Sequence, residues 1–214
     1  MAAIAGERVL LFPCNGNAIE AIDCVQPHQT LIGFVDDTDS KQGTTVHGLP
    51  VFGRDALSRF ADAKILAVPG SPASFRDRSR LITGLSIPRE RFTNLVHPRA
   101  SVSKLARLGT NCLFMSGVVI TSNAVIGDHV CLLPNTVVHH DAVIGNWTLI
   151  GSNVTIAGST HVGENCYIGS GTSIMNGLHV GDGSLVGLGS NVIRNAAAGS
   201  KLAGNPAKSI APTS

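Results

Sequence analysis

Histidine and carboxylate side chains are the residues of this 214-residue chain best suited to proton transfer near neutral pH. The chain holds eight histidines, and a histidine can take up and release a proton near pH 7. His139, His140 and Asp141 follow one another, so two imidazoles and a carboxylate share one short segment. A single histidine is more often a solvated surface group. Residue types alone therefore leave the choice of a base open.

His161 and His179 suggest a second kind of chemistry, because two histidines can ligate a metal ion. They stand 18 residues apart, three times the repeat described below, so we expect them to stack in neighbouring coils. The pair resembles the zinc-binding histidines of β-helical carbonic anhydrases, and a zinc enzyme of that kind is an alternative. We interpret the pair more simply as a solvated column and predict no metal.

Cysteine content and charge exclude several other classes of protein. The five cysteines are odd in number and form no C-x-x-C pair, so they indicate neither a disulfide framework nor a zinc knuckle: Cys14, Cys24, Cys112, Cys131 and Cys166. A net charge of +2 is too small for a nucleic-acid partner. No segment approaches the ~20 apolar residues of a membrane span, nor does the start resemble a secretory signal. We expect a cytoplasmic protein.

The first hundred residues alternate between predicted strands and helices. Short apolar runs predict strands over 8–13, 31–35 and 64–68, and an amphipathic stretch predicts a helix over 18–25. A further helix is expected to begin at Pro72, with Ser71 as its N-cap. This order favours a small parallel sheet wound in the Rossmann manner.

Polar and glycine residues follow each of these three strands. They are Asn15, Gly16, Asn17, Asp36, Asp37 and Gly70. Ligands of such sheets bind beyond the carboxyl ends of the strands, which is where these residues fall. The G-x-G-x-x-G fingerprint is missing, so we expect no dinucleotide cofactor. A nucleotide held by one glycine turn and an acidic pair is compatible, and ordinary loop residues are the alternative.

A six-residue period runs through the second half of the chain. An aliphatic residue or Phe stands at every sixth position from Val102 to Val192, sixteen positions in all. One inward side chain every six residues fits short strands joined by turns, and three repeats make a coil of 18 residues. Coils then stack at the spacing of neighbouring strands. Glycine often follows the inward residue, where a turn with little room or a positive φ needs it.

Several segments together resemble one family of enzymes. The repeats V-I-G-D-H-V, V-I-G-N-W-T and Y-I-G-S-G-T resemble the hexapeptide-repeat acyltransferases, whose β-helix is left-handed. With G-F-V-D-D, G-L-P-V-F-G, Val96-His97-Pro98 and the terminal A-G-N-P-A-K, the chain is similar over nearly its whole length to bacterial nucleotide-sugar acetyltransferases. These include relatives of sialic acid O-acetyltransferase, the 4-amino-sugar acetyltransferase of the bacillosamine pathway and GDP-perosamine N-acetyltransferase.

The resemblance implies a fold, an activity and partners. The fold is a Rossmann-like nucleotide-sugar domain over 1–97 and a left-handed β-helix over 98–214. The activity is transfer of acetyl from acetyl-CoA to the amine of a nucleotide-linked sugar for lipopolysaccharide, O-antigen or another surface glycan, in a homotrimer. A sugar hydroxyl as acceptor, the choice among UDP, GDP and dTDP, and a structural or nucleotide-sensing module without catalysis stay open.

The same resemblance assigns residues to roles. His140 stands where the family carries its general base, with Asp141 as the acidic partner, and His139 is the rival base. Gly158, Ser170 and Leu188 match positions that contact CoA. Several relatives carry a second histidine nine residues after the base, which binds the acetyl carbonyl. This chain has Leu149 there, so another group must polarise the carbonyl.

Overall fold

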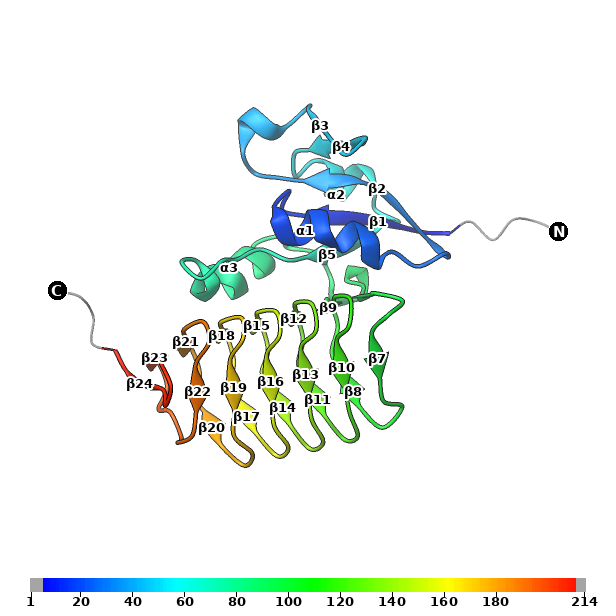
Figure 1. Ribbon diagram of the computed structural model, residues 1–214. Coiled ribbons are helices and arrows are strands. Elements are labelled where there is room, and N and C mark those ends of the chain that lie inside the picture. The colour runs from blue at the N-terminus through cyan, green and yellow to red at the C-terminus, as the bar shows by residue number, and fades with distance from the viewer. Residues whose placement is uncertain (1–5, 211–214) are drawn as a thin grey trace.

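The computed structural model describes residues 6–210, in which a small α/β part lies along one side of a long parallel β-helix (Figure 1). The elements of the α/β part are β1 (Glu7–Phe12), α1 (Gly16–Glu20), the 3₁₀ turns η1 (Ala21–Cys24) and η2 (Asp39–Lys41), β2 (Gln29–Val35), β3 (Thr45–Val46), β4 (Leu49–Phe52), α2 (Ala56–Arg59), β5 (Lys64–Ala67), the 3₁₀ turn η3 (Phe75–Asp77), α3 (Arg78–Thr83) and the 3₁₀ turn η4 (Arg89–Arg91).

The α/β part has a five-stranded sheet in the order β3-β4-β2-β1-β5. The strands β4, β2, β1 and β5 are parallel to one another, and β3 pairs antiparallel with β4. Alternate residues of β1 enter two different cores, Val9 and Leu11 on one face and Leu10 and Phe12 on the other. Burial on both faces explains why the predicted strands are continuous apolar runs. The carboxyl ends of β1, β2 and β5 are therefore neighbours at one edge.

The β-helix consists of two-residue strands at six-residue intervals. They are β6 (Leu95–Val96), β7 (Ser101–Val102), β8 (Arg107–Leu108), β9 (Leu113–Phe114), β10 (Val119–Ile120), β11 (Val125–Ile126), β12 (Cys131–Leu132), β13 (Val137–Val138), β14 (Val143–Ile144), β15 (Leu149–Ile150), β16 (Thr155–Ile156), β17 (His161–Val162), β18 (Tyr167–Ile168), β19 (Ser173–Ile174), β20 (His179–Val180), β21 (Leu185–Val186) and β22 (Asn191–Val192). The chain then turns back in the antiparallel pair β23 (Lys201–Ala203) and β24 (Lys208–Ser209). Every one of the sixteen predicted inward positions is the second residue of a strand, which confirms the repeat.

Three sheets form the sides of the β-helix. The six-stranded sheet contains β7, β10, β13, β16, β19 and β22, the lower five-stranded sheet contains β8, β11, β14, β17 and β20, and the eight-stranded sheet contains β6, β9, β12, β15, β18, β21, β23 and β24. Pairing is parallel at 18-residue steps, as in Val119 with Val137. The repeat and the coils fit the left-handed β-helix that the resemblance implied.

Close stacking of the coils accounts for the glycine that follows the inward residue. A Cβ on Gly145 would lie 2.5 Å from the main-chain nitrogen of Glu164 in the next coil. The reason is therefore lack of room, since φ of Gly145 is not positive. The inward side chains form one continuous core, with Leu108 as the exception at 38% exposure. Leu108 lies in β8, the end strand of its sheet, where no further coil covers it.

The outer face of the eight-stranded sheet packs against the α/β part. Leu113, Leu149 and Tyr167 lie in one apolar cluster with Leu11 and Phe75. The rings of Phe75 and Tyr167 are 5.9 Å apart. The two parts of the chain therefore share an apolar core. Through this core the α/β part covers one face of the β-helix, as Figure 1 shows.

Two helix predictions were wrong in detail. The predicted helix over 18–25 is a five-residue α-helix, α1, continued by the 3₁₀ turn η1. Ser71 is not an N-cap, because residues 71–74 form a turn, Ser71 Oγ bonds Ser74 Oγ, and α3 begins only at Arg78. The turn lets Phe75 reach the eight-stranded sheet, so tertiary packing outweighs the local signal of Ser71 and Pro72. The hairpin β3–β4 and helix α2 were not predicted.

Candidate active site

The turn between β13 and β14 carries the His140–Asp141 pair. His140 Nδ1 and Asp141 Oδ2 are 2.8 Å apart, and both side chains are about half exposed or more. Asn123, one coil earlier, donates to Asp141 Oδ1 at 3.1 Å. Hydrogen bonds from His140 and Asn123 hold the pKa of Asp141 below its usual value. A carboxylate that accepts from Nδ1–H leaves Nε2 of His140 free to accept a proton.

Gly158 lies directly beside the His140 ring. The two residues are 18 positions apart, so they share one corner of successive coils, and the Ser159 N–H donates to the His140 carbonyl at 2.9 Å. A Cβ at position 158 would stand 2.6 Å from His140 Nε2. The missing side chain therefore makes room for the imidazole. His139 lies in the same turn, and its ring makes no hydrogen bond to residues 6–210.

Ser170 and Leu188 lie on a different corner from His140. They follow β18 and β21, between the eight-stranded and six-stranded sheets, whereas His140 and Gly158 lie between the six-stranded and lower five-stranded sheets. Ser170 Oγ accepts from the Ser152 N–H at 3.0 Å, and Leu188 is 71% exposed. One chain therefore does not bring these two residues to His140.

Leu149 belongs to the docking face and not to the His140 turn. It is 3% exposed in β15 and packs in the core shared with the α/β part. An aliphatic side chain in this position cannot donate a hydrogen bond to an acyl oxygen.

Asn15, Gly16, Asp36 and Gly70 meet at the carboxyl ends of β1, β2 and β5. Asn15 Oδ1 caps α1 through the Ala18 N–H at 2.9 Å, and its Nδ2 donates to the Val68 carbonyl at 3.2 Å. Beside Gly16 a Cβ would meet no atom within 4 Å, so this turn faces open space. Asn17 is half-buried in the first turn of α1. The structure therefore brings most of the predicted nucleotide residues to one edge.

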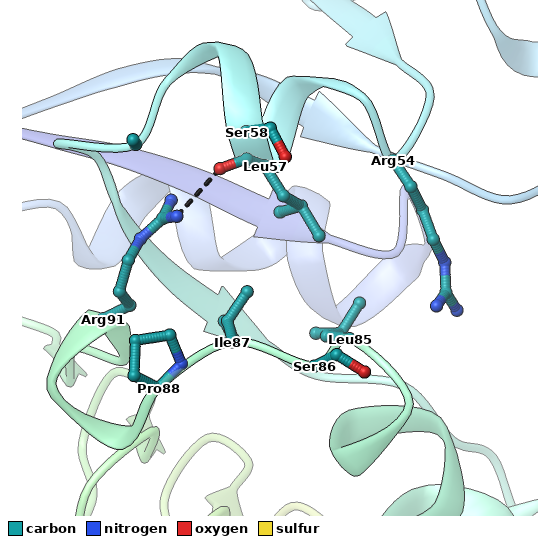
Figure 2. Close-up of a pocket in the computed structure, with 9 residues that line it drawn as sticks. Arg54, Leu57, Ser58, Leu85, Ser86, Ile87, Pro88 and Arg91 are labelled. Carbon is teal, nitrogen blue, oxygen red and sulfur yellow. Dashed lines mark hydrogen bonds between the residues drawn. The ribbon is translucent and has the colours of Figure 1, made fainter.

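The two aspartates of this edge point in different directions. Asp36 is buried, and its carboxylate accepts from the main-chain N–H groups of Cys14 and Thr38. Asp37 is exposed and forms a two-point ion pair with Arg54, at 2.6 and 2.7 Å. Arg54 also borders a hollow of about 540 Å³ between α2 and residues 85–91 (Figure 2).

Gly70 rests on a buried arginine that sequence reasoning missed. The φ of Gly70 is +115°, and a Cβ there would lie 2.8 Å from the Arg78 side chain. Arg78 is fully buried, and its guanidinium donates to the main-chain carbonyls of Pro69, His129 and Trp147. It thus ties the loop after β5 to two successive coils. No motif in the sequence distinguishes Arg78 from its neighbours Arg76 and Arg80.

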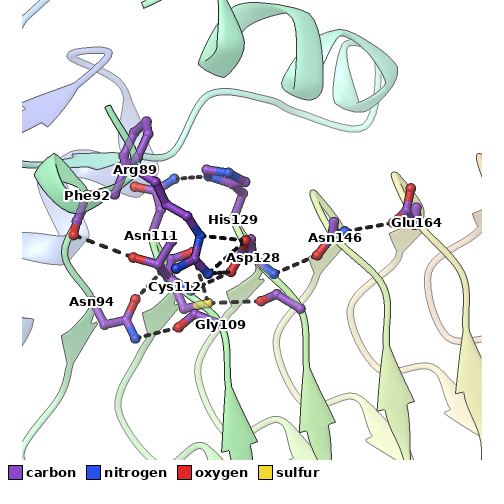
Figure 3. A network of polar contacts seen from close by, with 12 residues as sticks. Arg89, Phe92, Asn94, Gly109, Asn111, Cys112, Asp128, His129, Asn146 and Glu164 are labelled. Atoms are coloured by element: carbon purple, nitrogen blue, oxygen red, sulfur yellow. Dashed lines mark hydrogen bonds and ion pairs between the residues drawn. The ribbon is translucent and has the colours of Figure 1, made fainter. Parts of the chain in front are cut away.

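A polar network beside Arg78 completes the junction (Figure 3). The Asn111 side chain accepts from the Ala67 N–H at 2.6 Å and donates to the Ala67 carbonyl at 2.8 Å. The same amide nitrogen lies 2.9 Å from His129 Nδ1. Asn111 thereby bonds to β5 as a neighbouring strand would, and it fixes the end of β5 against the β-helix.

The histidine column stacks as predicted. His161 and His179 pair in β17 and β20, and their rings are 4.8 Å apart. Across residues 6–210 no three His, Cys, Asp or Glu side chains gather in a way that could hold a metal ion. The described helices include none long and apolar enough to cross a membrane.

Family models match the repeat region. Residues 123–158 match the bacterial transferase hexapeptide model, and residues 142–175 and 159–193 match the hexapeptide repeat of succinyl-transferase. A comparison with curated proteins gave no match.

Solved structures match nearly the whole chain. One is perosamine N-acetyltransferase from Caulobacter crescentus, solved as a histidine-to-asparagine variant with CoA and GDP-perosamine. It is 27% identical over 98% of both chains, with a TM-score of 0.85. PerB from the same organism, also with CoA and GDP-perosamine, is 28% identical over 98% of this chain and 99% of that one, with a TM-score of 0.84.

A third match is the acetyltransferase domain of PglB from Neisseria gonorrhoeae FA1090 with acetyl coenzyme A. It is 25% identical over 96% of this chain and all of that one, with a TM-score of 0.83. The repeat and the matched models make the chain similar to the hexapeptide-repeat transferases. The likeness to the solved structures extends through the α/β part as well, so the chain is similar over nearly its whole length to nucleotide-sugar acetyltransferases of this kind.

Proposed function

We propose that the protein transfers the acetyl group of acetyl-CoA to the amino group of a nucleotide-linked amino sugar. The observation that carries the proposal is the His140–Asp141 pair, with a free Nε2 beside Gly158, in a chain similar over 98% of its length to an enzyme solved with CoA and GDP-perosamine. CoA is a substrate here, and no metal is part of the proposed chemistry.

The reaction is a direct attack on the thioester. His140 Nε2 takes a proton from the sugar amine as the nitrogen attacks the carbonyl carbon, and a C–N bond forms. The tetrahedral oxyanion then collapses, the C–S bond breaks, and the proton on His140 passes to the thiolate of CoA. Asp141 holds the ring through Nδ1–H and stabilises the imidazolium. Because Leu149 has no donor, a main-chain N–H or another side chain would bind the oxyanion.

The chain divides by role into two domains. Residues 1–97 form the proposed Rossmann-like domain for the nucleotide, with Asn15, Gly16, Asn17, Asp36, Asp37 and Gly70 around it. Residues 98–214 form the proposed acetyltransferase domain. Strand β6, at Leu95–Val96, already pairs with β9 of the β-helix, so the chain enters the coils directly before this boundary.

Assembly follows from where the two halves of the site lie. The α/β part covers the eight-stranded sheet, and His140 lies on the corner between the other two sheets. The body of the β-helix thus separates the sugar-binding edge of a chain from its own base. A homotrimer brings the nucleotide domain of one copy to His140 of the next and makes the site complete. CoA would then contact Gly158 on one copy and Ser170 and Leu188 on its neighbour.

Exposed apolar side chains on the His140 corner support this assembly. Leu105, Met175 and Ile193 lie on that corner in other coils and are 64%, 46% and 44% exposed. A neighbouring copy would cover these side chains. Their removal from water would favour association of the copies.

The product would serve a bacterial surface glycan such as lipopolysaccharide O-antigen, and the reaction would take place in the cytoplasm. All five cysteines are free and buried, which is compatible with a reducing compartment.

The test combines ligand binding and turnover. Nucleotide sugars with an amino or a hydroxyl acceptor are screened by thermal shift with and without CoA, because a ligand of the native state raises the melting temperature. His140→Asn should lower kcat about 10²–10⁴-fold and keep both ligands bound, whereas His139→Asn should cost much less. Near-normal turnover by His140→Asn would refute the role of His140. Loss of activity with a chelator would instead indicate the zinc alternative.

A further inference from the structure

Lys41 brings an ammonium group to the edge where the predicted nucleotide residues meet. Its Nζ donates to the Cys14 carbonyl at 2.8 Å and to Asp36 Oδ2 at 3.0 Å. Cys14 directly precedes the Asn15-Gly16 turn, and the space beside Gly16 is open. An ammonium has three N–H donors, so one remains for a ligand.

The backbone around Lys41 is anchored, which distinguishes it from a surface lysine with a free stem. The Lys41 N–H donates to the Thr38 carbonyl at 2.9 Å, and the Thr44 N–H and hydroxyl both donate to the Lys41 carbonyl. The following residues join β4, where the Gly43 N–H donates to the Val51 carbonyl at 2.9 Å. The position of the ammonium is therefore set by the fold, and part of the ordering entropy of binding is already paid.

Asp36 holds Lys41 and is itself buried at 3% exposure. Its Oδ1 accepts from Thr38, and its Oδ2 accepts from Cys14 and Lys41. Burial alone would raise the pKa of Asp36, but the Thr38 and Lys41 hydrogen bonds outweigh it and keep the pKa below its usual value. A buried carboxylate with a lowered pKa therefore orients the turn and the lysine.

The second cation of this edge, Arg54, bonds partners other than the Gly16 turn. Arg54 gives Nε and one terminal nitrogen to Asp37, and the other terminal nitrogen to the Gly84 carbonyl. Of the two cations that pair with Asp36 and Asp37 within residues 6–210, Lys41 is the one that bonds Cys14, directly before the Gly16 turn.

We propose that Lys41 binds the diphosphate of the nucleotide-linked sugar and so makes the site selective for nucleoside diphosphates. The inference rests on the proposed function and adds to it the group that recognises the anionic bridge. A directed, charge-assisted N–H···O bond suits a phosphate oxygen, even though the Lys41–Asp36 pair is neutral as a whole.

The experiment uses calorimetric titration of the full chain with GDP, UDP and dTDP, and the one that binds wild type most tightly becomes the probe. Lys41→Met should weaken binding of this diphosphate about tenfold or more and leave binding of its nucleoside unchanged. The salt dependence of diphosphate binding should also become shallower. Lys64→Met is the matched control, because Lys64 opens β5 at the opposite edge of the sheet, and it should change neither affinity.

A double variant separates diphosphate binding from simple neutralisation of Asp36. The variant Asp36→Asn with Lys41→Met removes both charges of the ion pair. If Lys41 only neutralised Asp36, the double variant would bind the diphosphate as tightly as wild type. The loss of diphosphate affinity should persist in this variant. Recovery of wild-type affinity, or an equal loss for nucleoside and diphosphate in Lys41→Met, would overturn the inference and leave the proposed function intact. If none of the three diphosphates bound wild type, the nucleotide site itself would be refuted.

Discussion

Gly158 and His140 show how a single missing side chain shapes the proposed reaction centre. The glycine shares the corner of His140 one coil later, and its φ is not positive. The backbone conformation therefore does not require glycine at this position. The glycine is needed because any Cβ there would collide with the imidazole of His140. The family resemblance assigns Gly158 to CoA, whereas the structure gives it a second role as space for the base.

Gly158→Ala should separate these two roles. Its Cβ would stand 2.6 Å from Nε2, so the exposed ring must move while the fold is kept. We expect kcat to fall about tenfold to a hundredfold, because a displacement of the order of 1 Å misaligns proton transfer. Acetyl-CoA affinity, measured by titration, should stay unchanged. Acetyl-CoA affinity is also compared between Gly158→Ala and the double variant Gly158→Ala with His140→Ala. An equal loss of affinity in both would show that Gly158 contacts CoA directly.

His129 is a half-buried neutral histidine, and it predicts how the free energy of unfolding depends on pH. Its ring stacks on Trp147 at 5.8 Å and meets the edge of Phe92 at 5.2 Å, while Nδ1 must accept from the Asn111 amide. Burial lowers the pKa of His129 from 6.5 to about 4. Below pH 6.5 the unfolded chain takes up this proton before the folded chain does, so the folded state loses stability as pH falls toward 4.

The free energy of unfolding should therefore decrease between pH 6.5 and pH 4, and His129→Gln should flatten this part of the curve. Urea unfolding at several pH values measures it, and His28→Gln, at an exposed position, is the control. An unchanged slope in His129→Gln would show that other groups cause the acid sensitivity.

At the scale of elements, the loop between β5 and α3 is the main connection between the two parts of the chain. Arg78 joins this loop to the corners at His129 and Trp147, and Arg76 donates to the Gly183 carbonyl at 2.8 Å further along the β-helix. The proposed nucleotide edge thereby gains a fixed position relative to the coils.

Arg78→Met should test this connection. Methionine replaces the apolar stem but leaves three buried or half-buried carbonyls without a donor, so we expect the free energy of unfolding to fall by about 2–5 kcal/mol. Denaturant titration at a fixed protein concentration measures this loss. Arg80→Met removes an exposed pair with Asp77 and should cost less than about 1 kcal/mol. Similar losses in both variants would contradict the role given to Arg78.

The β-helix could be predicted from the sequence because its signal is local and repeated. Each inward residue from Val102 to Val192 occupies the same place in its strand, and only the end position Leu108 stays exposed. The turn after β5 could not be predicted, because Phe75 and Arg78 take their places from coils 50 to 90 residues later. Asn111 and His129 were missed for the same reason. The His140–Asp141 contact was expected from the family resemblance, and spacing alone did not select it.

At the scale of the whole molecule, the proposed site is divided between the two sides of the β-helix. A base on one corner and a sugar edge on the opposite face cannot serve one substrate within a single chain. In the proposed homotrimer, function therefore depends on assembly, and dissociation should abolish turnover without unfolding the chain.

Light scattering should give about three times the 22.1 kDa mass of one chain at working concentration. Charged substitutions of Met175 and Ile193 should lower this mass and the activity together. A fully active species of 22.1 kDa would contradict the divided site.

Side chains 18 residues apart bond to each other in neighbouring coils, and these contacts limit how the chain can change in length. Asn123 bonds Asp141, and Asn146 bonds Glu164, each one coil apart, so an insertion that stays within the coils and is not a whole coil long would misalign every later column. Whole coils between His129 and Gly183 are also fixed in number, because Arg78 and Arg76 reach both places from one short loop. Natural variation in length should therefore occur in 18-residue steps, beyond Gly183 and before the closing hairpin of β23 and β24.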